Sequence, residues 1–204
     1  YTPNAVIVDT LGAAFHSAFE AVEPTGKRHY LALDVSGSMQ VNCSGSQVLS
    51  CKVASAAMAL VTAAVEPSTH IVGFTGVGRY GQDGTELTAL PITGQTRLDD
   101  AISTVSRLPF GRTDCALPML DALERGIEAD VFCIYTDSET WSGRVHPMEA
   151  LRDYRKRTGI DAKLVVIGME ANPFTIADPA DAGALDVVGF DTRTPSAISA
   201  FVRG

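Results

Sequence analysis

Five short runs of apolar residues recur along the chain, and they constrain its fold more than any other feature. Each run is four or five residues long, and none alternates between polar and apolar side chains. A strand with one face in water alternates, whereas a parallel strand covered by helices on both faces does not. The runs are residues 30–33, 71–74, 131–135, 164–167 and 187–190. They predict a mostly parallel sheet that is buried on both faces.

Helical patterns separate these runs. A further short strand is expected at 86–92, where a glycine-rich turn indicates an antiparallel edge. Thr96 is a plausible N-cap for the helix that follows it. The helices are expected at 47–65, 97–108, 115–125, 147–157 and 195–202. Alternation of strand and helix predicts a Rossmann-like α/β fold with helices on both faces of the central sheet.

Length and composition bound the domain organisation. The chain has 204 residues, 46% of them hydrophobic, with no repeat and no linker-like stretch. We therefore expect a single domain over 1–204, in which 1–26 form an N-terminal helix and a lead-in. No run approaches the roughly 18 apolar residues of a membrane span. The chain does not begin with Met, and we interpret it as a piece cut from a longer protein.

Charge and cysteine content narrow the function classes. The formal net charge is −8, which is the wrong sign for a free-standing nucleic-acid binder, because phosphate is bound by basic surface. Four cysteines are too few for a disulfide framework in a domain of this size, and their spacing matches no zinc pattern. These features favour a reducing, cytoplasmic setting.

Oxygen-bearing side chains follow two of the expected strands and precede one of the helices. Asp34, Ser36 and Ser38 come directly after the run at 30–33, in the sequence DVSGS. Thr113 stands before the helix expected at 115–125, and Asp137 follows the run at 131–135. Because carboxyl ends of parallel strands meet at one edge, and ligands bind there, these groups should converge.

This convergence predicts a divalent-cation site. Three hydroxyls and two carboxylates form a hard oxygen set that suits Mg²⁺, which keeps several of its waters. The alternative for DVSGS alone is a helix entry made of capping residues, since Asp and Ser are favoured there. Thr113 and Asp137 at the expected positions favour the metal site. Asp114 and Glu139 are nearby acids that we assign to supporting or surface roles.

The same residues carry a family resemblance. The pattern Asp-x-Ser-x-Ser, followed by Thr and then Asp, resembles the metal-ion-dependent adhesion site of von Willebrand factor A domains. Longer patches are similar to the C-terminal A domain of the Ro ribonucleoprotein family, including its bacterial members. They are VEPTGKR at 22–28, TDCALPM at 113–119, VHP at 145–147, LRDYRK at 151–156 and FTIADP at 174–179.

The resemblance implies roles for individual residues. It implies that Ser36 and Ser38 bind the cation directly and that Thr113 binds it directly or through water. Asp34 and Asp137 are implied to act through water and to orient the hydroxyls. The implied cation is Mg²⁺ or another divalent ion such as Mn²⁺ or Ca²⁺. Neutral ligands leave such a cation electrophilic, so an acidic group of a partner can complete its coordination.

The expected function is a cation-dependent interaction module, not an enzyme, within a Ro-like protein that binds noncoding RNA. The family's helical-repeat ring, which binds Y RNAs, is absent from this chain. The implied partners are Y-like RNA through the full-length protein and an acidic protein partner, for which an RNA-degrading enzyme is a candidate. A monomer without membrane contact is expected.

Three alternatives stay open at this point. One is a Mg²⁺-dependent phosphohydrolase or nuclease, which usually needs more carboxylates on its metal. Another is an adaptor of the same fold unrelated to RNA. The third concerns the cations Arg144, Arg152, Arg155, Lys156 and Arg157, which form either a basic face for RNA phosphate or an ordinary solvated helix end.

Overall fold

The computed structural model describes residues 4–43, 46–75, 86–108, 113–137, 143–169, 176–189 and 193–204. Its six strands form one sheet in the order β3-β2-β1-β4-β5-β6. All neighbouring strands are parallel except β2 and β3, which pair antiparallel at one edge. The strands are β1 (Arg28–Asp34), β2 (Ser68–Thr75), β3 (Glu86–Ala89), β4 (Val131–Thr136), β5 (Lys163–Gly168) and β6 (Ala184–Val188). The predicted parallel sheet with one antiparallel edge strand is confirmed.

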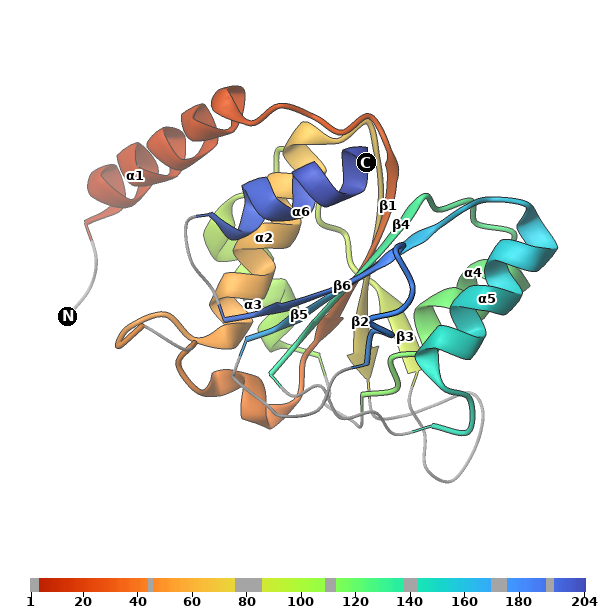
Figure 1. The fold of residues 1–204 in the computed structure, drawn as a ribbon. Helices are drawn as coiled ribbons and strands as arrows, with labels where there is room; N and C mark the ends of the chain where they lie inside the picture. Colours follow the sequence, from red (N-terminus) through yellow and green to blue (C-terminus); the bar gives the residue numbers. More distant parts are fainter. Residues whose placement is uncertain are drawn as a thin grey trace.

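Helices cover both faces of this sheet (Figure 1). One face packs against α2, α3 and α6, and the other against α4 and α5. The helical segment α1–η1 lies on the side of α2 and α6. The helices are α1 (Ala5–Ser17), η1 (Ala18–Ala21), η2 (Gly37–Gln40), α2 (Cys51–Val65), α3 (Leu98–Ser106), α4 (Leu117–Arg125), α5 (Pro147–Thr158) and α6 (Thr194–Arg203).

The central strands form two cores because successive side chains of a strand point to opposite faces. In β1, Leu31 and Leu33 join the core under α2, while Tyr30 and Ala32 join the core under α4 and α5. Every residue of β4 is buried. Burial on both faces explains why these segments read as continuous apolar runs in the sequence.

Several element boundaries differ from expectation; strand β3, for example, was expected over 86–92 and ends at Ala89. Helix α2 begins at Cys51 and not at 47, because residues 42 and 50 pair as an antiparallel bridge and the Ser50 side chain caps the helix. The assignment of Thr96 as an N-cap is wrong, since its hydroxyl accepts the N–H of Thr93 in the preceding turn. Strand β6 ends at Val188, because this residue pairs with Gly168 at the end of β5. Residue 190, the last of the run expected there, lies outside the described residues.

All four cysteines are buried and form no disulfide; they are Cys43, Cys51, Cys115 and Cys133. Burial raises the pKa of the Cys133 thiol to about 12, so it carries its proton at neutral pH. Within the described residues, no helix is both long and apolar enough to cross a membrane.

One buried and one half-buried histidine predict a loss of stability on mild acidification. Burial lowers the pKa of His29 against the opposing charges of Glu66 and Asp130, and it lowers the pKa of His70 with help from Arg125. Each also has a buried ring nitrogen without a hydrogen-bond partner among the described residues, where a proton would be costly. Below pH ~6.5 the unfolded chain therefore binds protons that the folded chain refuses, and stability falls.

We expect the free energy of unfolding to decrease between pH 7.5 and 5.5, with each histidine contributing a slope of at most ~1.4 kcal/mol per pH unit. Urea unfolding at several pH values measures this slope. The double variant His29→Gln, His70→Gln should flatten it, whereas His16→Gln on α1 should leave it in place. An unchanged slope in the double variant would contradict the assignment.

Candidate functional site

The candidate site lies at the carboxyl ends of β1 and β4, the lower edge of the sheet in Figure 1. Leu33 pairs with Tyr135 across these strands, so Asp34 and Thr136 lie side by side where the strands end. The chain then leaves β1 through η2, which presents Ser36 and Ser38 at the same edge. Strand register and the turn after β1 therefore bring these groups together.

A buried carboxylate organises the site. Asp34 is 2% exposed, and its Oδ1 accepts the Ser36 N–H at 2.8 Å. Its Oδ2 accepts two hydroxyl hydrogen bonds, from Thr113 at 2.6 Å and from Thr136 at 3.0 Å. These three donors are neutral, so they orient the carboxylate but leave its negative charge in place. A buried charge of this kind favours a nearby cation.

Two serine hydroxyls stand beside this carboxylate. The Oγ atoms of Ser36 and Ser38 lie 2.9 Å apart, within hydrogen-bond distance. Ser36 is half-buried and Ser38 is exposed, so the pair reaches from the carboxylate to the surface. Asp137 is buried and follows Thr136 directly, which puts it at the same strand end. The structure thus brings Asp34, Ser36, Ser38 and Thr113 together, with Asp137 directly after Thr136 in the chain.

The donor set fits a small divalent cation. Mg²⁺ binds oxygen at 2.0–2.1 Å in octahedral geometry, so two neighbouring ligand oxygens lie about 2.9 Å apart. The Oγ atoms of Ser36 and Ser38 already have this separation. Within the described residues, no three His, Cys, Asp or Glu side chains gather into a group that could hold a metal ion.

Thr136 lies in the candidate site, although the sequence analysis did not include it among the site residues. Its side chain is 1% exposed, and its hydroxyl shares Oδ2 of Asp34 with Thr113. A polar residue that ends an otherwise apolar run, directly before an acid, is the signal that could have revealed it. Its role is to hold Asp34 in place from the neighbouring strand.

We expect Thr136→Val, which keeps the shape but removes the hydroxyl, to lower the free energy of unfolding by ~1.5–3 kcal/mol, the usual contribution of a hydrogen bond to a charged group. Chemical denaturation measures the change. The matched control Thr10→Val on the exposed side of α1 should stay within ~0.5 kcal/mol. Equal stabilities for the two variants would show that the Thr136 hydroxyl does not support Asp34.

The two residues that follow Thr113, Asp114 and Cys115, support the structure around it. Asp114 is half-buried, which raises the pKa of its carboxyl, and its Oδ1 accepts the Ala116 N–H at 3.0 Å. This bond fixes the turn that leads into α4. Burial, together with the charges of Asp34 and Asp114, raises the pKa of the Cys115 thiol. Residue 139, the other nearby acid, lies outside the described residues.

The cations near α5 are largely paired with acids. Three of the five that could have formed a basic face make ion pairs. The pairs are Arg152 with Asp178, Arg155 with Asp181 and Arg157 with Asp153. Pairing neutralises much of the charge that phosphate would need, so the solvated helix end is the better interpretation of this face.

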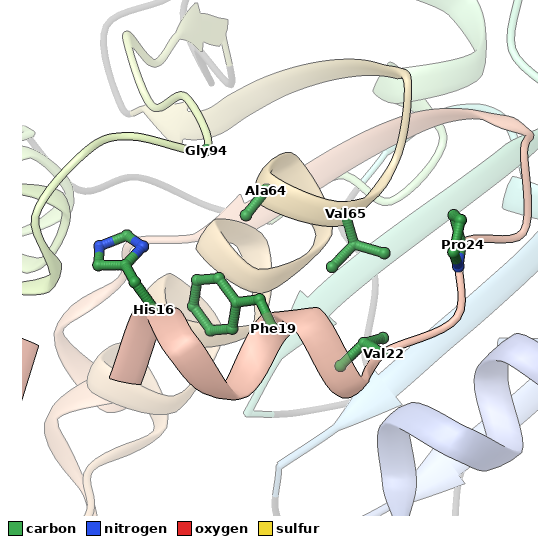
Figure 2. Close-up of a pocket in the computed structure, with 7 residues that line it drawn as sticks. All are labelled: His16, Phe19, Val22, Pro24, Ala64, Val65 and Gly94. Carbon is green, nitrogen blue, oxygen red and sulfur yellow. The ribbon is translucent and has the colours of Figure 1, made fainter. Parts of the chain in front are cut away.

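A separate hollow lies at the opposite edge of the sheet, between α1–η1 and the end of α2 (Figure 2). Its volume is about 380 Å³. In Figure 2, His16 and Phe19 come from the α1–η1 side and face Ala64 and Val65 of α2. Its labelled lining is mostly apolar, and it shares no residue with the cluster around Asp34. The hollow is therefore not part of the candidate site.

Comparison with known proteins decides the family. Residues 28–202 match the model of the Ro60 vWA domain, which is most of the chain. The chain belongs to the Ro60 vWA domain family. This confirms the resemblance drawn from the sequence patches and agrees with the mostly parallel sheet.

Relatives of this Ro60 vWA domain are similar along the whole chain. It is 45% identical over 205 residues to the RNA-binding protein RO60 of Caenorhabditis elegans, and 42% identical to that of Deinococcus radiodurans. Both matches cover 100% of this chain, but only 30% and 37% of those proteins. The chain thus spans about a third of the length of these relatives.

Solved structures agree with this assignment. The crystal structure of the Deinococcus radiodurans RO (RSR) protein is similar with a TM-score of 0.87 and 41% identity. That match covers 100% of this chain and 40% of the other. The manganese-loaded Plasmodium vivax TRAP protein has a TM-score of 0.52 at 16% identity, over 87% of this chain and 74% of the other, which shows a shared fold.

Proposed function

We propose that this Ro60 vWA domain is a divalent-cation-dependent interaction module of a longer RNA-binding protein. Ser36 and Ser38 would hold the cation directly, Thr113 directly or through water, and Asp34 and Asp137 through water. Mg²⁺ is the preferred cation, with Mn²⁺ and Ca²⁺ as alternatives. When bound, the cation supplies an electrophilic centre at the surface of the domain. The module acts by binding and not by catalysis.

The observation that carries this proposal is the geometry around Asp34. A buried carboxylate is oriented by one N–H and two hydroxyls, and it lies next to two serine oxygens 2.9 Å apart. The ligands offered are mostly neutral, so they cancel little of a cation's charge. Mg²⁺ keeps exchangeable waters, and a carboxylate oxygen from outside is a natural replacement for one of them. Ser38 is exposed, which supports access from the surface.

The link to RNA comes from the relatives, which are named RNA-binding proteins. They are about three times as long as this chain, and we propose that noncoding, Y-like RNA binds through the remainder of such a protein. The net charge of −8 and the paired arginines of α5 support a minor part for this domain in holding phosphate. The contribution of this domain is then to recruit an acidic protein partner in the cytoplasm.

The test is a pair of crystal structures of the domain, one with Mg²⁺ alone and one with Mg²⁺ and a peptide that carries a single glutamate. We expect the cation on Ser36 and Ser38 in both, and a glutamate oxygen in place of one water in the second. Thr113 should then approach the cation. A coordination sphere closed to the peptide in both crystals would make the cation structural and overturn the docking role. Turnover of a phosphodiester substrate with Mg²⁺, lost in Asp34→Ala, would overturn the non-catalytic role.

A further inference from the structure

Gly143 and Asp114 meet at the edge of the candidate site. Asp114 follows Thr113 just before α4, and Gly143 precedes α5. A Cβ atom placed on Gly143 would lie 2.5 Å from Oδ2, 2.6 Å from Cγ and 2.7 Å from Oδ1 of Asp114. Real Cβ atoms do not approach other atoms this closely, so with a side chain at position 143 either this carboxylate or the backbone of residue 143 must shift.

The Asp114 carboxylate has little freedom to move away. Its Oδ1 accepts the Ala116 N–H at 3.0 Å, and its own carbonyl accepts the Leu117 N–H at 3.0 Å. These two bonds tie Asp114 to the first turn of α4. Displacing the carboxylate would break the first bond and loosen this turn. Thr113 is directly bonded to Asp114 in the chain, so a shift of the loosened turn would move its hydroxyl as well.

The glycine at 143 is explained by space and not by backbone conformation. Its φ does not fall in the left-handed region that favours glycine, unlike that of Gly126, which ends α4. The backbone of residue 143 could therefore accept alanine. An alanine side chain there would instead meet the carboxylate of Asp114.

We propose that Gly143 is a positioning residue for the Thr113 hydroxyl. By leaving room for the Asp114 carboxylate, it lets the turn before α4 place Thr113 Oγ1 2.6 Å from Asp34. Through this contact the segment before α5 restrains the segment before α4. Gly143 thereby affects the cation site without supplying a ligand. This inference rests on the proposed function, because Thr113 is placed there among the ligands.

The experiment compares Gly143→Ala with the wild-type domain. Without metal, we expect the Ala116 amide to exchange its hydrogen about tenfold faster, because its acceptor is displaced, and the Thr113 amide resonance to shift. With MgCl₂ as the titrant, calorimetry should show affinity weakened about tenfold, the usual scale of an overpacked contact. Gly12→Ala, in a helix with open space around it, is the control and should change neither quantity.

A double-mutant cycle separates positioning from general damage. Asp114→Ala removes the carboxylate, so adding Gly143→Ala in that background should weaken Mg²⁺ binding no further. An equal loss with and without the carboxylate would overturn the inference, as would unchanged exchange at Ala116 in Gly143→Ala. If the wild-type domain binds no Mg²⁺, the proposed function fails by itself. The exchange of Ala116 and the Thr113 resonance then decide whether Gly143 positions this turn.

Discussion

The double variant Ser36→Ala, Ser38→Ala is expected to lose Mg²⁺ binding by at least ~100-fold while remaining folded. Substitutions that only support metal ligands already cost 10–100-fold, and this variant removes two proposed direct ligands at once. The fold should persist because Ser36 is half-buried, Ser38 is exposed, and their mutual hydrogen bond contributes only ~0.5–1.5 kcal/mol.

Calorimetric titration with MgCl₂, together with thermal unfolding, measures both quantities on one sample. Ser17→Ala is the control, because this serine lies on α1 and its hydroxyl bonds to the carbonyl of Ala13 in the same helix. Wild-type affinity in the double variant would remove the serines from the proposed ligand set. A large drop in melting temperature would instead indicate that the two hydroxyls serve the fold.

The largest expected effect on stability concerns Glu66, which follows α2. Its side chain is 6% exposed, and its two oxygens accept the N–H groups of Thr25 and Gly26 at 2.8 and 3.0 Å. It also lies 3.6 Å from Nε2 of His29 in β1. One carboxylate therefore joins the end of a helix to the segment that leads into the central strand.

We expect Glu66→Ala to lower the free energy of unfolding by roughly 3 kcal/mol. Each hydrogen bond to a charged group is worth ~1.5–3 kcal/mol, and two are lost. Part of this loss is recovered because the N–H of the exposed Gly26 can bond to water instead. For a chain of this size the melting temperature should drop by about 6–12 °C. Glu23→Ala is the control: its carboxylate is 82% exposed in its ion pair with Arg203, and such pairs contribute little. Equal melting temperatures for the two variants would contradict the anchoring role.

The strands could be predicted because burial on both faces leaves a direct mark on the sequence. The runs at 30–33 and 131–135 became β1 and β4, whose side chains are buried on both sides. The prediction of the sixth strand was less accurate. Ala184–Val188 is an edge strand with partly exposed residues, and its bounds are set by its pairing with β5, which ends at Gly168. Its own apolar pattern at 187–190 is therefore a poor guide.

The candidate site, like the strands, could be predicted only in part. Asp34 and its serines could be placed from topology alone, because strand ends in a parallel sheet share one edge. The hydroxyl of Thr136 could not, since its approach to Asp34 depends on the register of Leu33 against Tyr135. The contact of Gly143 with Asp114 depends on how two loops pack, which no local pattern records. Local chemistry thus predicted which groups belong to the site, and tertiary packing decided what holds them.

The strand order also sets when the site can exist during synthesis on the ribosome. β1 is central, with β2 on one side and β4 on the other, yet β4 begins about a hundred residues later in the chain. The two hydroxyl groups that bond to Asp34, those of Thr113 and Thr136, stand 79 and 102 residues downstream of it. At ~5–20 residues per second, the β4 side of β1 stays unpaired for at least ~5–20 s. The nascent chain thus exposes an apolar strand edge for seconds, a natural substrate for chaperones.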